Sequence, residues 1–428
     1  MVLELGRIPV KEIAWGRKTL LEGAVLRVHR EELIEKTKGD DPRITSVKAH
    51  IARPGESVRI LPVKDVIEPR VKVEGKGGIF PGLISGVETV GSGRTHALQG
   101  CAVVTAGQVV GVQEGLIDMS GPGARYSAFS KTLNVVLAIN VKHSISRHEH
   151  EEALRLAGLR AAVYLGEAGR SVKPIDVDRF EVYPLFKPKE DSNDLPGIAY
   201  VYMLLSQGLL HDTYLYGQNA ASLLPTLIMG TEAMDGAIVS GNCVSACDKN
   251  TTYHHQNNPV IRELFKRDGI DLRFLGTVIS NCNVTLRDKM GSAQYGVKLV
   301  ELLGADGAVI TKEGFGNPDA DAMMYCAGLE EKGIRTVMIT DEFAGIDGAS
   351  QSLADTTPQA DAVVSTGNAN ERISLPPMDK VIGDIRIIER MAGGQSGSLS
   401  REGITVELQA ILGAANELGF ELLSARGE

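Results

Sequence analysis

The sequence lacks the features that mark membrane proteins and nucleic-acid-binding proteins. Its most apolar stretch, residues 198–210, is too short to cross a bilayer and is interrupted by Ser206, Gln207 and Gly208. No run of basic residues occurs and the net charge is −9, so neither nucleic acid nor an anionic membrane is an expected partner. Residues 1–7 also lack the charged-then-apolar pattern of a signal peptide, and we expect a cytoplasmic protein.

Cysteine is scarce, and complete nucleotide-binding motifs are absent. The 428 residues include only 5 cysteines, an odd number spread widely along the chain, which argues against a disulfide framework. Cys101 and Cys326 lie in apolar surroundings and are expected to be buried. The glycine-rich pieces complete neither a G-x-G-x-x-G motif nor a phosphate loop, so we interpret them as turns and expect no nucleotide cofactor.

The first third of the chain is predicted to be mostly β. Short β-branched runs separated by glycine and proline continue to about residue 140, with one short helix expected at residues 31–36. A capping box of Ser146 and Glu149 then begins a helix, and the charged cluster His148–Glu152 is expected to form its solvated first turn. We therefore predict a β-rich domain at residues 1–142 and a second domain at residues 143–428.

From residue 197 onward, apolar strands alternate with helices. Strands are predicted near residues 198–205, 236–240, 272–279, 306–310, 335–339 and 361–365. Helices are predicted near residues 219–234, 259–266, 292–303, 318–332 and 404–418, and residues 172–195 are expected to form an irregular connection. This alternation predicts an α/β fold with a largely parallel sheet and helices on both of its faces.

Small or polar residues follow the predicted strands of this sheet. Ligands of open α/β sheets bind at the carboxyl ends of the strands, which directs attention to the segments Gly241-Asn242-Cys243, Lys312-Glu313 and Thr340-Asp341. The loop at residues 241–258 is also much longer than the usual βα loop of about 2–6 residues. Its length favours a functional role for this loop.

The dipeptide Asn242-Cys243 at the start of the loop has a specific chemical capacity. If the Cys243 thiol attacks the Asn242 carbonyl, an acyl shift gives a thioester, and elimination then cuts the chain and leaves a pyruvoyl group in place of Cys243. The reaction requires strain at the junction and a base near the Cys243 α-proton. Gly241 permits an unusual backbone geometry, and His254 or His255 is the candidate base.

Other interpretations of Cys243 and Cys247 remain open on spacing alone. The two cysteines with His254 or His255 permit a zinc site or a metal-dependent oxidoreductase, although a second pair of ligands is not clearly placed. A redox dithiol usually has C-x-x-C rather than this C-x-x-x-C spacing. They are equally explained as two small loop cysteines, and we expect no metal.

The segment from Ser240 to Pro259, SGNCVSACDKNTTYHHQNNP, resembles the processing segment of the component B proproteins of the glycine, sarcosine and betaine reductase family. The resemblance extends over the whole chain, including GFGNPDAD from Gly314, and D-proline reductase proproteins are more distant relatives. It implies cleavage between Asn242 and Cys243 into a β chain of residues 1–242 and an α chain of residues 243–428. Cys243 then becomes the pyruvoyl cofactor.

The resemblance also implies partners and a reaction. Family members assemble with a selenocysteine-containing subunit of component B and work with selenoprotein A and component C. The substrate amine forms a Schiff base with the pyruvoyl carbonyl, a partner's selenolate displaces the amine, and component C produces acetyl phosphate. A cytoplasmic hetero-oligomer acting in amino-acid fermentation is expected.

Three further residues are candidates because of their positions past predicted strands. Lys312 is the candidate for binding the substrate carboxylate, and Glu313 or Asp341 for moving protons, although structural salt bridges explain these residues equally well. Glycine and sarcosine suit a pyruvoyl group better than betaine, whose quaternary nitrogen cannot form a Schiff base. The alternatives are a D-proline reductase type of proprotein, which a substrate panel distinguishes, and a non-catalytic scaffold.

Overall fold

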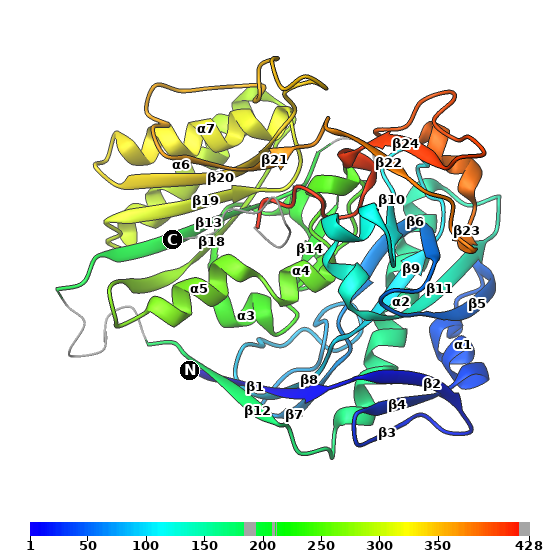
Figure 1. Ribbon diagram of the computed structural model, residues 1–428. Coiled ribbons are helices and arrows are strands. Elements are labelled where there is room, and N and C mark those ends of the chain that lie inside the picture. The colour runs from blue at the N-terminus through cyan, green and yellow to red at the C-terminus, as the bar shows by residue number, and fades with distance from the viewer. Residues whose placement is uncertain (184–193, 208–209, 211, 419–428) are drawn as a thin grey trace.

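The computed structural model describes residues 1–183, 194–207, 210 and 212–418 (Figure 1). It has a mixed α/β fold, as predicted, built mainly on two six-stranded sheets. The first sheet has the order β10-β6-β9-β11-β5, and β23 pairs with β6. Its strands are β5 (Ile44–Ala52), β6 (Val58–Ile67), β9 (Cys101–Ala106), β10 (Gly115–Asp118), β11 (Leu133–Val141) and β23 (Lys380–Gly383).

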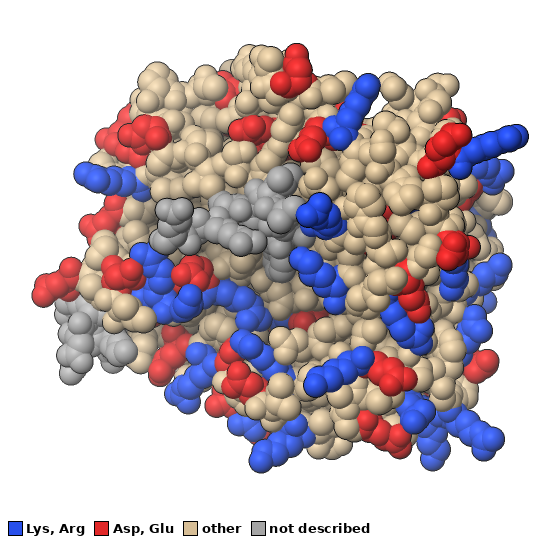
Figure 2. Space-filling view, in the orientation of Figure 1, with Lys and Arg blue, Asp and Glu red and all other residues tan. Residues whose placement is uncertain are grey.

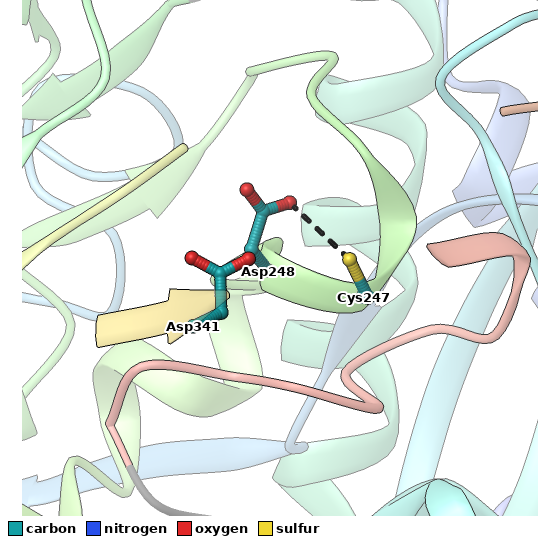
Figure 3. Close-up of side chains that lie close together, drawn as sticks. All are labelled: Cys247, Asp248 and Asp341. Carbon is teal, nitrogen blue, oxygen red and sulfur yellow. Dashed lines mark hydrogen bonds between the residues drawn. The ribbon is translucent and has the colours of Figure 1, made fainter. Parts of the chain in front are cut away.

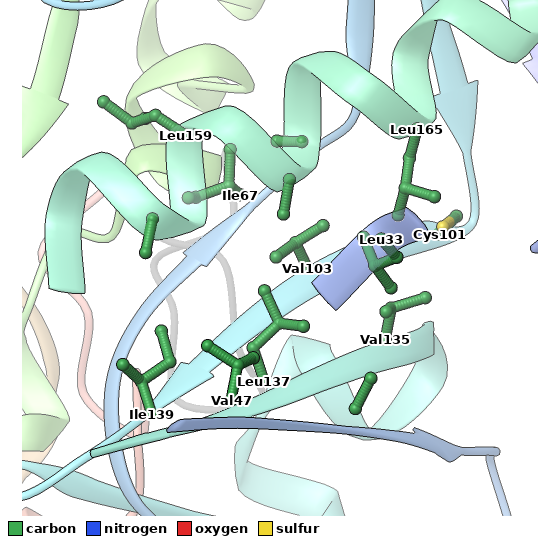
Figure 4. Packing of buried hydrophobic residues seen from close by; sticks show 14 of the residues in the cluster. Leu33, Val47, Ile67, Cys101, Val103, Val135, Leu137, Ile139, Leu159 and Leu165 are labelled. Carbon is green, nitrogen blue, oxygen red and sulfur yellow. The ribbon is translucent and has the colours of Figure 1, made fainter. Parts of the chain in front are cut away.

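Two helices pack on the first sheet and form its core. They are α1 (Arg30–Lys38) and α2 (Arg147–Gly166), and α2 begins with the predicted capping box of Ser146 and Glu149. Figure 4 shows Leu165 of α2 directed toward the sheet near Cys101 and Val135, and Leu159 of α2 belongs to the same buried cluster. Cys101 lies in the same core, so its predicted burial is confirmed, as is that of Cys326.

Smaller sheets complete the N-terminal half. One has the order β12-β1-β8-β7 and contains β1 (Val2–Pro9), β7 (Arg70–Glu74), β8 (Gly93–Gln99) and β12 (Asp176–Glu181). Another has the order β2-β4-β3, with β2 (Glu12–Gly16), β3 (Leu20–Glu22) and β4 (Val25–His29). The strand β12 lies in the segment that we expected to be irregular. It pairs antiparallel with β1. The predicted domain boundary after residue 142 stays a prediction.

The second six-stranded sheet is the predicted parallel sheet, with one antiparallel edge strand, β16 (Thr226–Ile228). Beyond β16 its order is β18 (Arg273–Asn281), β13 (Gly197–Leu204), β19 (Gly307–Lys312), β20 (Arg335–Glu342) and β21 (Val363–Asn368). Alternate residues of β13 belong to apolar clusters on opposite faces of the sheet. Val201 packs in the cluster with α6 (Leu286–Leu302) and α7 (Asn317–Glu330). Tyr202 packs in the cluster with α3 (Gly230–Met234) and α5 (Pro259–Arg267). Helices therefore cover both faces (Figure 1).

Two predicted helices are wrong. Residues 219–234 form β15 (Gln218–Asn219), β16 and only the short α3, because Pro225 cannot donate a helical hydrogen bond. Residues 404–418 begin with β24 (Ile404–Glu407), which pairs antiparallel with β22 (Arg372–Leu375). The β-branched residues of β24 favour a strand, and Gly413 has φ of 79°, outside the helical region.

The strand before the Asn242-Cys243 dipeptide also differs from expectation. That strand, β17 (Ile238–Ser240), is not part of the parallel sheet. It pairs with β14 (Thr213–Leu215) in a small antiparallel sheet completed by β15. The dipeptide therefore follows a strand of the small antiparallel sheet rather than a strand of the parallel sheet.

The surface has no single dominant charge on the face shown in Figure 2, where lysine and arginine are interspersed with aspartate and glutamate. Among the described residues, no helix is long and apolar enough to cross a membrane. Both observations agree with the composition.

The buried ion pair between β6 and β10 provides a test of the first sheet. Arg59 donates to both carboxylate oxygens of Asp118 at 2.6 and 2.8 Å, and the two side chains are 2% and 0% exposed. We expect Asp118→Ala to lower the free energy of unfolding by about 3–5 kcal/mol, because it leaves a buried guanidinium without its counter-ion. Urea denaturation measures this loss. Arg386→Ala, which removes a surface pair with Asp384, is the control and should leave the midpoint unchanged.

Candidate functional site

The Asn242-Cys243 dipeptide is completely buried, with both residues 0% exposed. The Cys243 N–H donates to the Leu210 carbonyl at 2.8 Å, and the Cys243 side chain joins the core cluster that contains Val239. Gly241 lies against the ring of Tyr214, where a Cβ atom would come within 2.6 Å of a ring carbon. Glycine is therefore required here for close packing rather than for backbone freedom.

Two buried ammonium groups bind the Asn242 carbonyl oxygen. Lys249 donates to it at 2.7 Å and Lys64 at 3.3 Å. Lys64 comes from the middle of β6, whereas Lys249 follows the 3-10 helix η6 (Ala246–Asp248) in the long loop. The two lysines are at most 1% exposed. The carbonyl that we expect the Cys243 thiol to attack thus lies in a site that would stabilise a negative charge on its oxygen.

The two lysines at this carbonyl have pKa values that are shifted in opposite directions. Burial lowers the pKa of Lys64, but the charge of Glu151 and of other acidic neighbours outweighs it, so the pKa is raised. The Glu151 carboxylate is 3.5 Å from the Lys64 ammonium. Burial, with repulsion from Lys64, lowers the pKa of Lys249 to about 8. Burial raises the pKa of Cys243 to about 11, although both lysines oppose this shift.

The Asn242 side chain is joined to the end of the parallel sheet. Its Nδ2 donates to Thr213 Oγ1 at 3.0 Å and to Glu313 Oε1 at 3.1 Å. Glu313 directly follows β19, and its other oxygen accepts from the Leu205 N–H and the Thr213 hydroxyl. Burial raises the pKa of Glu313 to about 7. The structure therefore places Glu313 in direct contact with the dipeptide.

The two candidate histidines lie on α4 (Thr252–Gln256), buried in different surroundings. His255 hydrogen-bonds to the Tyr202 hydroxyl through Nδ1 at 2.7 Å, and its Nε2 is 3.5 Å from Glu313 Oε1. His254 accepts from the Thr251 N–H and packs on the ring of Phe129. Burial lowers the pKa of His254 and that of His255 to about 3, so both are neutral at pH 7. His255 is the histidine that the structure connects to Asn242, through Glu313.

Lys312 and Asp341 belong to a separate, neighbouring cluster. The Lys312 ammonium donates to the Gly314 carbonyl at 2.7 Å and lies 3.0 Å from Asp319 and 3.4 Å from Asp341. Burial raises the pKa of Asp341 to about 6, although Lys312 opposes the shift. The ammonium of Lys312 thus forms buried ion pairs with Asp319 and Asp341. A structural salt bridge was the alternative to substrate binding for this residue.

A small pocket of about 220 Å³ opens beside the residues that follow Cys243. Its lining includes Val244, Ser245, Gly314, Gln207 and Asn317. Gln207 Nε2 is buried and has no hydrogen-bond partner among the described residues. The pocket is adjacent in sequence to position 243 through Val244, and Gln207 offers it a buried polar group.

Sequence reasoning missed the residues that surround the Asn242 carbonyl. Lys64 lies in β6, a fully buried strand that also contains Arg59 and Asp65, and these charges inside a buried strand were the available signal. Glu151 was expected to be solvated, but it is 4% exposed and lies between Lys64 and Arg155. The capping residues of α2 are exposed as expected, and only the next turn faces the interior.

Comparison with known proteins gives matches over the whole chain. A family model described as glycine/sarcosine/betaine reductase component B subunits matches residues 1–426. The chain is 57% identical to the glycine reductase complex component B subunits alpha and beta of Peptoclostridium acidaminophilum, over 100% of both. It is 52% identical to the sarcosine reductase complex component B subunit alpha of the same organism, again over 100% of both.

A more distant similarity links the chain to the D-proline reductase proprotein of Acetoanaerobium sticklandii. The two are 21% identical over 81% of this chain and 55% of that protein. No solved structure is significantly similar to this chain.

The packing at Gly241 can be tested by adding one methyl group. We expect Gly241→Ala to destabilise the protein by about 1–3 kcal/mol, because the new Cβ would lie 2.6 Å from the Tyr214 ring and 2.7 Å from the Asp212 carbonyl oxygen. Chemical denaturation measures the change. The matched control is Gly291→Ala in α6, whose Cβ would meet nothing within 4 Å. That control should stabilise the helix by about 0.5–1 kcal/mol, and a Gly241→Ala protein as stable as this control would contradict the packing argument.

Proposed function

Because this chain belongs to the family of glycine/sarcosine/betaine reductase component B subunits, we propose that it is a proprotein that cleaves itself between Asn242 and Cys243. The observation that carries the proposal is the pair of buried ammonium groups on the Asn242 carbonyl. A relative of the same length has a name that assigns two subunits, alpha and beta, to one chain, which also supports cleavage. The products would be residues 1–242 and 243–428.

The first step is transfer of the Asn242 acyl group from nitrogen to sulfur. The Cys243 thiol releases its proton to solvent water, and the resulting thiolate adds to the Asn242 carbonyl carbon. The negative charge on the oxygen forms between Lys64 and Lys249, where each donor is worth about 3–4 kcal/mol to the transition state. When the carbon–nitrogen bond breaks, the Lys249 ammonium gives its proton to the departing nitrogen. A thioester, a free amine and a neutral Lys249 remain.

The second step is elimination. The neutral Lys249 amine takes the α-proton of residue 243, the Cβ–S bond breaks, and Asn242 leaves as a thiocarboxylate that water converts to a carboxylate with release of hydrogen sulfide. The remaining dehydroalanine tautomerises to an imine, and water releases ammonia to give the pyruvoyl group. We assign the proton transfer to Lys249 rather than to His254 or His255. Lys249, with a pKa of about 8, can both donate and accept a proton near neutral pH. Each histidine, with a pKa of about 3, is a weak base.

In the mature protein, the group at position 243 would supply a carbonyl electrophile for the substrate amine. Gln207 Nε2 in the adjoining pocket is the donor that we propose for the substrate carboxylate, because Lys312 is held by Asp319 and Asp341. Glu313, with a pKa of about 7, can hold or release a proton beside this position. The pocket of about 220 Å³ suits a small amino acid.

The proposed substrate is glycine or sarcosine. Relatives named for glycine and sarcosine reductases are 57% and 52% identical to this chain, against 21% for the D-proline reductase proprotein. These relatives are named as subunits of a complex component, which supports a hetero-oligomer. Its proposed members are the selenocysteine-containing subunit of component B, acting with selenoprotein A and component C in the cytoplasm.

Substitution of the two loop cysteines tests the cleavage. We expect Cys243→Ala to remain one chain and to be inactive with its partners, because no thiol is present to attack the Asn242 carbonyl. Cys247→Ala, the matched control four residues away, should still cleave. Denaturing mass spectrometry resolves the chains, and borohydride or hydrazine reagents label the carbonyl at the new terminus. An active complex that contains only the intact chain would instead support the scaffold alternative.

The pH dependence of the acyl shift tests the role of Lys249. The thiolate fraction rises with pH up to the Cys243 pKa of about 11, whereas protonated Lys249 is lost above its pKa of about 8. The rate should therefore rise about tenfold per pH unit below pH 8 and level off above it. It is measured as cleavage by excess hydroxylamine of the chain made in a cell-free extract.

The variant Lys249→Met should react about 100–1,000 times more slowly and show no break near pH 8, because its carbonyl has lost one donor. A break that persists in Lys249→Met would rule out this lysine as the titrating group.

A further inference from the structure

A second buried cluster lies on the other side of the processing loop and is rich in negative charge. Asp248, Asp319, Asp341 and Glu417 are each at most 1% exposed. In the described part of the chain, Lys312 is the only cation that forms an ion pair with any of them. Four carboxylates thus face one ammonium. Uncompensated buried charge costs several kcal/mol per ion, so the cluster requires either protons or a further cation.

Three potential ligand atoms converge within this cluster. The Cys247 Sγ, one oxygen of Asp248 and one oxygen of Asp341 all lie within 4.8 Å of one another. Figure 3 shows the carboxylate of Asp248, on the loop, between Cys247 and the carboxylate of Asp341 at the end of β20. This group differs from the set of Cys243, Cys247 and a histidine that the spacing allowed.

The Asp248 side chain points into this group with one carboxylate oxygen unsatisfied. Its Oδ2 has no hydrogen-bond partner among the described residues, and its Oδ1 accepts a long hydrogen bond of 3.9 Å from the Cys247 Sγ. Asp341 Oδ2 and Glu417 Oε2 are also without hydrogen-bond partners in the described structure. The orphaned oxygens and the excess of acid point to the same requirement for positive charge.

We propose that Cys247, Asp248 and Asp341 bind a first-row divalent cation of the zinc type. A thiolate favours zinc over magnesium or calcium, and carboxylate oxygens are compatible with zinc at the same site. Glu417 and Asp319 add negative charge around the ligands without being ligands themselves. Metal binding would release the thiol proton, because a coordinated cysteine is a thiolate.

Such a cation would fix the segment that follows Cys243 to the parallel sheet. Cys247 and Asp248 lie on the loop, whereas Asp341 lies on β20, so one ion bridges the two. This role rests on the proposed function: after cleavage, residues 243–248 begin a new chain, and the cation holds this arm in place. Cation binding itself does not depend on cleavage.

Zinc binding to the full-length protein tests the inference. The protein is stripped with a chelator, titrated with zinc chloride by calorimetry and, after dialysis, analysed for metal by mass spectrometry. We expect about one tight zinc per chain, unaffected by a large excess of magnesium. Cys247→Ala and Asp248→Asn should each bind zinc at least about tenfold more weakly. Cys101→Ala, which removes another buried thiol in β9, is the matched control and should bind as the wild type does.

Two measurements guard against variants that fail to fold and separate this inference from the cleavage proposal. In the wild type, zinc should slow amide hydrogen exchange at residues 244–250, and bound cobalt should show a thiolate charge-transfer absorption that Cys247→Ala lacks. Cys243→Ala, which stays uncleaved, should still bind zinc. Absence of stoichiometric zinc from the wild type, unchanged exchange, or loss of zinc in Cys243→Ala would each overturn the proposal.

Discussion

The hydrogen bonds that two buried lysines make to one peptide carbonyl govern much of the architecture. An ammonium group taken out of water needs acceptors and counter-charge. Lys64 and Lys249 share the Asn242 carbonyl, and Glu151 of α2 lies beside Lys64. These groups come from β6, from α2 and from the long loop. The same buried charges therefore link α2, the first sheet and the loop, in addition to the apolar core that α2 forms with the sheet.

The long loop serves two adjacent sites through neighbouring residues. Lys249 reaches back to the Asn242 carbonyl, whereas Asp248 points toward Asp341 at the end of the parallel sheet. Since the two side chains are adjacent in the chain, a shift of the backbone at one would displace the other. This loop has little regular structure and is almost completely buried, and its charged groups at residues 248 and 249 point to two different sites.

The sequence allowed the parallel strands of the second sheet and most of its helices to be predicted, whereas the strand before Asn242-Cys243 belongs to a different sheet. Apolar runs such as β13 and the capping box of Ser146 are local signals, and they predicted these elements correctly. The predicted helices at 219–234 and 404–418 were wrong because Pro225 and the β-branched residues of β24 disfavour a helix locally, and pairing with β18 and β22 places both segments in sheets. Family resemblance pointed to Cys243, but not to its surroundings.

The groups around the carbonyl were hidden for a related reason. Lys64 is nearly 180 residues from Asn242, and Glu151 has the same local pattern as a solvated acid at the start of a helix. Only the packing of α2 against β6 makes them partners. Conversely, Lys312 and Asp341 were correctly placed at strand ends, but their mutual ion pair, rather than the dipeptide, is what they contact. Position along a sheet edge is predictable, whereas the pairing of charges across it depends on the whole fold.

The strand β23 would keep the two products of the proposed cleavage associated. It belongs to residues 380–383, yet it extends the first sheet by pairing in parallel with β6. The two chains made by a break after Asn242 would remain interlocked through a shared sheet and a shared core, as in a nicked or split protein whose fragments complement each other. Breaking one covalent bond would then change the chemistry of a single terminus while leaving the topology intact, and the fragments would separate only when the sheet itself unfolds.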